Sequence, residues 1–280
     1  MTATPDENAK WAVALFNRSV LKQEKYRRIT ELIEDPVGRT SLDIGADNGT
    51  ISYLLRQRGG RWYSADLDER AVVSIRELVR DGVYRLDGSR TPFANAAFDQ
   101  VVVVDYLEHI PDDDAFGAEL ARILRPGGCV IINVPHLKPR SLINRLRHAI
   151  GLTDEWHGHL RPGYRLEDIR RLLGPRFKIE QYRTYSKAFS ELVDTLLNGV
   201  NELRRGRDRG TRATRKGTIT TSADLRRRRK EFRLLSAIYP ALWVMARLDH
   251  LLWAQSGYKL IVRARLRPEQ PPAASPSNAE

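Results

Sequence analysis

The pattern of apolar and polar positions divides the first half of the chain into alternating helices and strands. Residues 9–34 place apolar side chains three and four positions apart, which predicts a helix that ends at Asp35-Pro36. From residue 40 to residue 135, short apolar runs alternate with amphipathic stretches. We therefore expect strands over residues 41–45, 62–66, 83–86, 100–105 and 129–134, and helices over residues 49–58, 69–79 and 113–124.

The fourth and fifth of these strands are nearly continuous apolar runs, Val101–Val104 and Val130–Ile132. Strands of this kind are typical of a parallel sheet that helices cover on both faces. The alternation of strand and helix predicts an α/β fold with a doubly wound, mostly parallel sheet. Such sheets bind ligands at the carboxyl ends of their strands.

The second half of the chain has a less regular pattern. We expect helices over residues 140–150 and 164–173, and strands over residues 177–185 and 258–266. We divide the chain into an N-terminal helical cap (1–39), a ligand-binding α/β domain (40–185 and 258–266), a basic helical insertion (186–257) and a disordered tail (267–280).

Composition narrows the class of protein. Hydrophobic residues make up 41% of the chain, enough for a core, and charged residues 29%. The single cysteine, Cys129, excludes an internal disulfide and a cysteine-rich metal site. The first ten residues are polar and show no signal peptide. A cytoplasmic location is therefore expected.

The net charge of +12 comes almost entirely from one segment, because residues 203–233 hold thirteen Lys or Arg against three acidic residues. Such a segment suits an anionic partner, namely lipid headgroups, a phosphorylated substrate or RNA, or else forms a solvated loop. No aromatic residue lies between Arg204 and Lys230 to stack on bases, so nucleic acid is disfavoured.

An apolar stretch follows the basic segment. Residues 234–246 hold no charge, but a membrane span needs about twenty residues. Trp243 and Trp253 beside the arginines fit a helix lying at the inner face of a membrane. The alternative is a helix that packs on the domain or on a second copy of the chain, and the sequence leaves the oligomeric state open.

A glycine turn follows the first predicted strand. The spacing from Asp43 to Gly45 and Gly49 places two glycines between a strand and a helix, where the backbone can approach a ligand. Dinucleotide-binding turns use Gly-x-Gly-x-x-Gly, and this chain has Asp47 and Thr50 at the second and third glycine positions. The turn therefore fits a dinucleotide poorly.

Two further acids stand at successive strand ends. Asp66 ends the second strand, 21 residues after Gly45, where a carboxylate can accept both hydroxyls of a ribose. Asp87-Gly88 follows the third strand, within reach of an adenine amino group. Each acid alone is more often a cap or turn residue, but three in order indicate an adenosyl site.

These motifs together resemble one family. Residues 41–135 resemble the class I S-adenosylmethionine-dependent methyltransferases of the type 11 group. The shared motifs are Leu42-Asp43-Ile44-Gly45, Ala65-Asp66, Asp87-Gly88, Pro92-Phe93, Phe98-Asp99, Leu107-Glu108-His109-Ile110 and Leu124-Arg125-Pro126-Gly127-Gly128.

The resemblance implies a Rossmann-like sheet of seven strands, with residues 258–266 as an antiparallel strand between the fifth and sixth. It also implies S-adenosyl-L-methionine as cofactor, held by Asp43, Gly45, Ala46, Asp47, Gly49, Asp66, Leu67, Asp87, Gly88, Asp105 and Tyr106. The family usually has glycine where this chain has Asp47. An aspartate there can cap the following helix, but it adds negative charge near the carboxylate of the cofactor.

The chemistry of methyl transfer points to the histidines. The protein aligns donor and acceptor, and it needs a base only when the acceptor must lose a proton. Candidate bases are His109 after the fourth strand, His136 after the fifth, and His157 and His159 in the following loop. For His109, packing or capping of the next helix is an equal alternative. No paired carboxylate spacing accompanies the histidines, so we expect no metal.

The acceptor is less defined. The fourth strand is followed by Asp105-Tyr106-Leu107-Glu108 in place of an Asn/Asp-Pro-Pro-Tyr/Phe motif, which disfavours amino methylation of adenine or glutamine. This leaves an oxygen, nitrogen or carbon of a small molecule, a sugar or a lipid-linked saccharide. The alternatives are a non-catalytic cofactor-binding module that acts through protein partners, and an RNA methyltransferase that uses the basic insertion.

Overall fold

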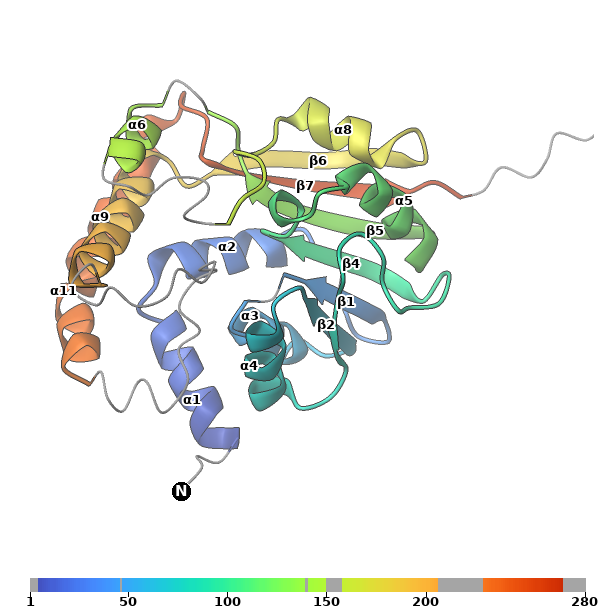
Figure 1. Ribbon diagram of the computed structural model, residues 1–280, viewed down its shortest axis with the longest axis horizontal. Coiled ribbons are helices and arrows are strands. Elements are labelled where there is room, and N and C mark those ends of the chain that lie inside the picture. Colours follow the sequence, from blue (N-terminus) through green and yellow to red (C-terminus); the bar gives the residue numbers. More distant parts are fainter. Residues whose placement is uncertain (1–4, 46, 139–140, 150–157, 206–228, 269–280) are drawn as a thin grey trace, which may run out of the picture.

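A computed structural model describes residues 5–45, 47–138, 141–149, 158–205 and 229–268. Within them lies a seven-stranded sheet of order β3-β2-β1-β4-β5-β7-β6 (Figure 1). Strand β7 runs antiparallel to its neighbours β5 and β6, and the other neighbouring pairs are parallel. The predicted fold class and the inserted last strand are confirmed. The strands are β1 Thr40–Ile44, β2 Arg61–Asp66, β3 Val83–Arg85, β4 Phe98–Val104, β5 Leu124–Pro135, β6 Phe177–Tyr185 and β7 Lys259–Leu266.

Helices cover both faces of this sheet. The described helical segments are α1 Pro5–Phe16, α2 Val20–Thr30, α3 Thr50–Arg56, α4 Glu69–Val79, η1 Leu107–His109, α5 Asp113–Ile123, α6 Leu142–Ala149, α8 Leu166–Leu173, α9 Ala188–Arg205, α11 Arg229–Arg247 and η2 Leu248–Leu252. Successive valines of β4 point to opposite cores: Val101 and Val103 pack in the core that α5 and α8 share, and Val102 packs in the core of α2 and α3. This is the burial on both faces that the apolar runs predict.

The N-terminal region differs from its prediction. A single helix over residues 9–34 is wrong, because α1 ends at Phe16 and α2 begins at Val20. Ser19 lies between them with extended backbone, and its hydroxyl accepts a hydrogen bond from the amide of Lys22 (3.4 Å). Serine is a preferred N-cap, and this local bond outweighs the continuous apolar spacing.

The carboxyl ends of the parallel strands point toward α2 and toward the paired helices α9 and α11 (Figure 1). Asp249 of η2 accepts hydrogen bonds from the amides of Lys187 (2.7 Å) and Phe189 (2.9 Å) at the start of α9. The side chain of Gln23 on α2 donates to the hydroxyl of Tyr239 on α11 (3.0 Å). Residues 206–228, which hold most of the basic segment, lie outside the described residues. None of the described helices is long and apolar enough to cross a membrane.

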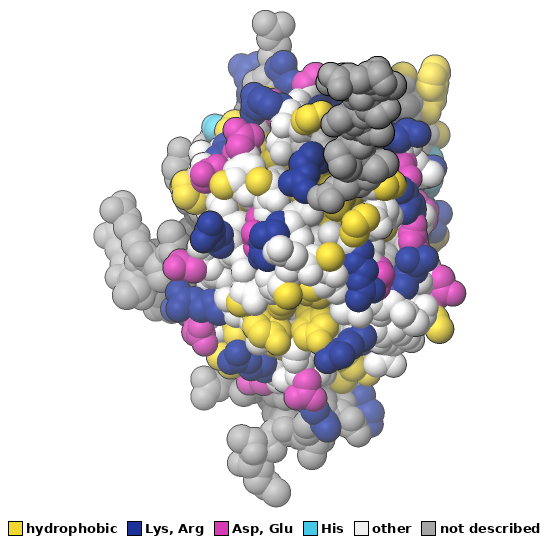
Figure 2. Space-filling view, turned by 90° about the vertical axis from the view of Figure 1, so that its right-hand side faces the viewer, with side chains coloured by type: hydrophobic (Ala, Val, Ile, Leu, Met, Phe, Trp, Pro, Cys, Tyr) yellow, Lys and Arg dark blue, Asp and Glu magenta, His cyan; other side chains and the backbone are white. Residues whose placement is uncertain are grey.

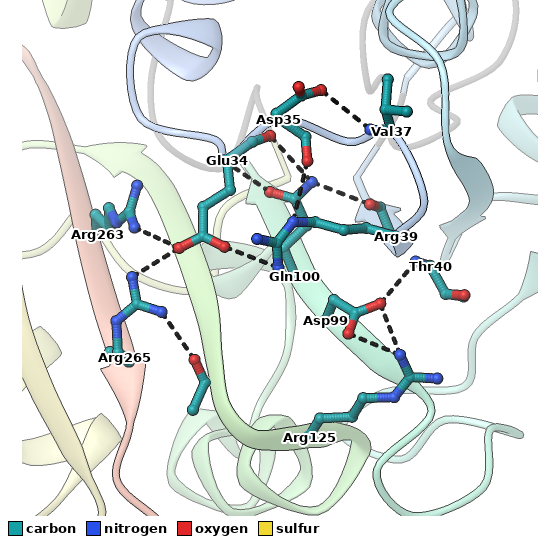
Figure 3. Close-up of polar contacts among 12 residues, drawn as sticks. Glu34, Asp35, Val37, Arg39, Thr40, Asp99, Gln100, Arg125, Arg263 and Arg265 are labelled. Carbon is teal, nitrogen blue, oxygen red and sulfur yellow. Dashed lines mark hydrogen bonds and ion pairs between the residues drawn. The ribbon is translucent and has the colours of Figure 1, made fainter.

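The opposite end of the sheet is closed by ion pairs. Glu34, after α2, contacts Arg263 (2.8 Å) and Arg265 (2.7 Å) of β7, and Asp99 of β4 contacts Arg125 of β5 (2.7 Å) (Figure 3). Figure 2 shows the face at this end, where basic and acidic side chains are interspersed around small groups of hydrophobic ones. The ion pairs at this end stabilise the fold, whereas the motifs predicted to bind cofactor and acceptor lie at the other end of the sheet.

Candidate cofactor and acceptor site

The glycine turn after β1 is shaped by a close approach of two strands. Gly45 has a φ of 81°, and a Cβ on it would lie 2.0 Å from the carbonyl oxygen of Val104 in β4. Gly49, with a φ of 79°, forms the N-cap of α3 without a side-chain bond. Both glycines are buried, and a Cβ on Gly49 would lie 2.8 Å from the Cα of Ile75 in α4, so the turn packs too closely against β4 and α4 for any larger residue.

Asp43 supports this turn from inside. Its buried carboxylate accepts hydrogen bonds from Ser52 of α3 (2.6 Å) and Ser64 of β2 (2.8 Å), and Arg56 lies 3.7 Å away. Burial raises the pKa of Asp43 above its ordinary value, against the opposing effect of Arg56 and the two hydroxyls. Asp43, which the sequence predicts to be a cofactor residue, holds β1, β2 and α3 together through these contacts.

Asp47 occupies a left-handed backbone position, with a φ of 52°. Asp47 does not cap α3: its carboxylate pairs with Lys22 of α2 (3.3 Å), while the side chain of Asn48 accepts from the amide of Thr50 (3.3 Å). Asp47 contributes to the site through its backbone, because its amide donates to Asp66 (3.2 Å). Ala46, beside it, lies outside the described residues.

Asp66 ends β2 with a fully buried side chain. Its two carboxylate oxygens accept hydrogen bonds from the amides of Asp47 (3.2 Å) and Asp68 (3.0 Å). These bonds aim the carboxylate at the glycine turn, in the place where the sequence predicts a partner for ribose hydroxyls. The next residue, Leu67, is partly buried and packs against the main core.

Tyr106 joins the ends of β3 and β4. Its buried hydroxyl donates to the carbonyl oxygen of Gly88 (2.6 Å). Burial raises the pKa of Tyr106, and the negative charges of Asp66 and Asp87 raise it further, so the phenol stays protonated and both acids lie within its electrostatic reach. The structure thus brings Asp66, Asp87 and Gly88 around one tyrosine.

Asp105 has different partners from those predicted. It follows β4 with a φ of 43°, and its carboxylate forms ion pairs with Lys25 of α2 and with Lys259 of β7 (3.2 Å). Burial alone would raise the pKa of Asp105, but the two ammonium groups hold it well below its ordinary value. Asp105 therefore fastens α2 and β7 across the carboxyl ends of the strands.

Two of the four predicted histidines come together beside η1. The ring centroids of His109 and His159 lie 5.0 Å apart, and Nε2 of His159 lies 4.0 Å from Oε1 of Glu108. Nδ1 of His109 contacts the carbonyl oxygen of Gly158 (2.9 Å), and the amide of Leu160 donates to the carbonyl oxygen of Glu108 (2.8 Å). Residues 158–160 therefore fold directly onto η1.

His136 is not part of this group. His136 lies at the end of β5, where its Nδ1 contacts the carbonyl oxygen of Gly257 (2.8 Å). His157 lies outside the described residues. The sequence motifs alone do not single out Glu108 as a chemical group, although a glutamate directly before a histidine at a strand end is a usable signal. Burial raises the pKa of the Cys129 thiol to about 11, so it is no nucleophile.

Comparison with known proteins agrees with this geometry. The family described as methyltransferase domain matches residues 42–132. An uncharacterized methyltransferase of Mycobacterium sp. (strain JLS) is 31% identical over 99 residues, which are 35% of this chain and 39% of that protein. One from Mycobacterium tuberculosis (strain ATCC 25618 / H37Rv) is 31% identical over 103 residues, 36% and 41% of the two chains. The chain carries a class I S-adenosylmethionine-dependent methyltransferase domain.

These matches leave out most of the relatives' length, because the chain spans about two fifths of each. Solved structures extend the likeness of fold over the whole domain. The (4+2)-cyclase SpnF superposes with a TM-score of 0.57 and 17% identity, covering 88% of this chain and 81% of its own. A SAM-dependent methyltransferase of Methanosarcina mazei gives a TM-score of 0.51 and 15% identity, covering 86% and 97%. At such identities the likeness shows the fold.

The residues around the glycine turn fit the cofactor of this family. Gly45 and Gly49 give the turn its left-handed backbone, Asp66 offers a buried carboxylate, and a Cβ added at Gly88 would meet no atom within 4 Å. A carboxylate that accepts hydrogen bonds and free space beside Gly88 suit the ribose and adenine of an adenosyl group. The residues that fit the cofactor lie at or just after the carboxyl ends of β1, β2 and β3.

Proposed function

We propose that this chain transfers a methyl group from S-adenosylmethionine to an oxygen, nitrogen or carbon of a small-molecule, sugar or lipid-linked acceptor. The observation that supports this most is the arrangement of Asp66, Asp87 and Gly88 around Tyr106, opposite the turn at Gly45. When bound, the cofactor supplies an electrophilic methyl group on its sulfonium. The residues of this chain bind the cofactor, align the acceptor and manage its proton.

The acceptor side is formed by η1 and residues 158–160. The contact between Nδ1 of His109 and a backbone carbonyl requires a proton on Nδ1, because a carbonyl oxygen only accepts. The lone pair of the neutral ring is then on Nε2, which can take a proton from an acceptor hydroxyl or ammonium. His159, at 5.0 Å between ring centroids, is the second candidate for this role.

Cofactor binding is the first test. Isothermal titration of the full chain with S-adenosylmethionine should show one site, and Asp66→Asn should weaken it at least tenfold, because an amide cannot accept from both ribose hydroxyls. The matched control is Asp68→Asn, since Asp68 caps α4 and asparagine caps equally well. Absence of binding to the unmodified chain would overturn the proposal.

Methyl transfer is the second test. The likeness to a cyclase shows that this fold also accommodates other reactions, so binding alone does not establish methylation. Incubation with methyl-labelled cofactor and metabolite extracts should give a labelled product that His109→Asn reduces at least tenfold. Cofactor binding with no labelled product would favour a non-catalytic binding module. Label confined to RNA would favour the RNA methyltransferase.

A lipid-linked acceptor is supported by one observation. The segment of α11 and η2 exposes large apolar side chains, among them Trp243 (41% exposed), Leu251 (71%) and Trp253 (85%). The guanidinium of Arg247 lies 4.5 Å from the ring centroid of Trp243. Aromatic and cationic groups side by side on an exposed helix are typical of a membrane interface. Because α9 and α11 lie beyond the carboxyl ends of the strands, such a surface would present acceptors to the site (Figure 1).

A further inference from the structure

Three side chains from two segments converge beside the end of β4. Glu108, His109 and His159 each place one potential metal ligand atom within 4.8 Å of the others. The separation between Nε2 of His159 and Oε1 of Glu108 is 4.0 Å. Two ligands of one tetrahedral zinc-sized ion lie about 3.4 Å apart, since each bond is about 2.1 Å long. The ligand atoms of this group would therefore move about 1 Å or less to bind one ion.

The tautomer of His109 suits a metal ligand. Its Nδ1 donates to the carbonyl oxygen of Gly158 (2.9 Å), which leaves the lone pair on Nε2. Histidines that bind metals commonly hold their second nitrogen on a carbonyl or carboxylate in this way, which fixes the tautomer and the ring plane. This contact is independent of the clustering, and it leaves Nε2 as the nitrogen that can bind an ion.

The group is held rigidly. Leu160, next to His159, donates its amide to the carbonyl oxygen of Glu108 (2.8 Å). Arg161 donates to the carbonyl oxygens of Ile110 (3.2 Å) and Pro111 (2.9 Å). These bonds fix residues 158–161 on η1, so the histidine ring has little freedom to leave. Preorganised ligands of this kind lose little entropy when an ion binds.

The burial of Glu108 favours a cation beside it. Its side chain is fully buried, where a carboxylate gains most from a positive charge. The charges of Asp105 and Glu108 raise the pKa of Lys259 against the effect of burial, and Lys259 forms its ion pair with Asp105 (3.2 Å). A buried carboxylate beside two imidazoles is a set of donors that a divalent cation would stabilise.

We propose that Glu108, His109 and His159 bind a divalent transition metal ion. Two imidazoles and one carboxylate suit Zn²⁺ or Fe²⁺, whereas Mg²⁺ and Ca²⁺ prefer oxygen ligands throughout. This departs from the sequence expectation of no metal, because the carboxylate comes from η1 and the spacing within the histidine loop does not reveal it. Three protein ligands leave room for a water molecule.

An acceptor hydroxyl could replace that water, and a bound cation would lower its pKa, with the histidines then acting as ligands and not as bases. This role of the metal in activating the acceptor rests on the proposed function, whereas the binding of the metal does not. A titration with the metal alone therefore tests metal binding separately from methyl transfer.

The experiment uses the full chain without an affinity tag, stripped with a chelator. Titration with Co²⁺ should produce d–d absorption bands at one ion per chain, and Zn²⁺ should abolish them while Mg²⁺ should not. His159→Ala and Glu108→Gln should each weaken Co²⁺ binding at least 100-fold. The matched control is His148→Ala, an exposed histidine of α6, which should bind as the unmodified chain does.

Loss of metal binding can be distinguished from loss of the fold. Thermal unfolding followed by circular dichroism identifies a variant that has lost its fold, and His159, which is partly exposed, decides the question if the buried Glu108 variant unfolds. The proposal is overturned if Co²⁺ gives no bands with the unmodified chain. It is equally overturned if a folded His159→Ala variant binds with unchanged affinity.

Discussion

At the scale of single residues, the charge at position 47 sets the first prediction. Asp47 has a φ of 52°, and its ion pair with Lys22 joins two side chains that are 49% and 39% exposed. Such exposed pairs contribute about 0.5 kcal/mol or less, and a non-glycine left-handed residue costs about 1 kcal/mol. We expect Asp47→Gly to raise the free energy of unfolding slightly and to tighten S-adenosylmethionine binding two- to fivefold, measured by urea denaturation and titration calorimetry.

The matched variant Asp47→Asn separates charge from backbone strain. Asparagine keeps the shape and tolerates the left-handed region, but it removes the negative charge near the carboxylate of the cofactor. It should tighten cofactor binding as much as glycine does, without the gain in stability. Weaker binding by Asp47→Asn would show that the carboxylate itself helps the cofactor.

The other residue-scale prediction concerns crowding at Gly45. A methyl group there would meet the carbonyl oxygen of Val104 at 2.0 Å, so β1 and β4 would have to separate. We expect Gly45→Ala to lower the free energy of unfolding by about 3 kcal/mol or more, measured by urea denaturation. Gly38→Ala is the control, because Gly38 also has a positive φ (74°) but no atom within 4 Å. It should cost only about 1 kcal/mol, and equal losses would rule out the crowding.

At the scale of elements, the sequence predicts regular segments well and their contacts poorly. The strand over residues 177–185 and the helix over residues 69–79 have the bounds expected from periodicity. The break at Ser19 was missed because a side-chain cap competes with apolar spacing that continues through it. In the site, the turn at Gly45 and the strand end at Asp66 follow local signals. The approach of His159 to Glu108 depends on how the loop of His159 packs against η1 in the folded chain, and hydrophobic periodicity does not predict such tertiary contacts.

The exposed apolar segment of α11 and η2 gives the element-scale prediction. If this segment contacts a membrane, the full chain should float with vesicles that contain anionic lipid. The double variant Leu251→Glu/Trp253→Glu should reduce the floated fraction by roughly 80% or more, because it replaces two anchoring side chains with charges. Val73→Glu is the control, because Val73 on α4 is 48% exposed and lies apart from that segment.

Two results would count against a membrane contact. Flotation that the double variant leaves unchanged would assign any lipid binding to another part of the chain. No flotation of the unmodified chain, together with a concentration-dependent dimer that the double variant dissolves, would assign the apolar surface to a second copy.

At the scale of the whole molecule, ion pairs connect segments that are far apart in sequence at both ends of the sheet. Lys25 and Lys259 meet at Asp105 on the site end, and Glu34 meets Arg263 and Arg265 on the other (Figure 3). The net charge of the sequence does not reveal these ion pairs, because it adds up all charges without regard to which of them the fold brings together. Both groups connect the N-terminal segment, through Lys25 of α2 and through Glu34, to the last strand.

This pairing predicts the response to acid. Burial would raise the pKa of Glu34, but Arg265, Arg39 and Arg263 lower it below its ordinary value of 4.5, and the lysines likewise lower the pKa of Asp105 below 3.8. A carboxyl whose pKa is lower in the folded state stabilises the fold above its ordinary pKa and loses that effect as the pH falls through the folded value. The free energy of unfolding should therefore decline from about pH 5 downward, measured by urea denaturation between pH 7 and pH 3.

Substitution locates the source of that decline. Glu34→Gln should lower the free energy of unfolding at pH 7, because Arg263 and Arg265 lose one of the two carboxylates that they share, Glu180 being the other. It should also make the fall between pH 5 and pH 3 shallower. Glu77→Gln, at an exposed position of α4, should leave the slope unchanged. Asp43 has the opposite effect on stability, because burial raises its pKa in the folded state. Its contribution to the free energy of unfolding is present at low pH and is lost as the pH rises through the folded-state pKa. A slope that Glu34→Gln does not alter would show that the acid response arises elsewhere, with Asp105 and its two lysines the next pair to test.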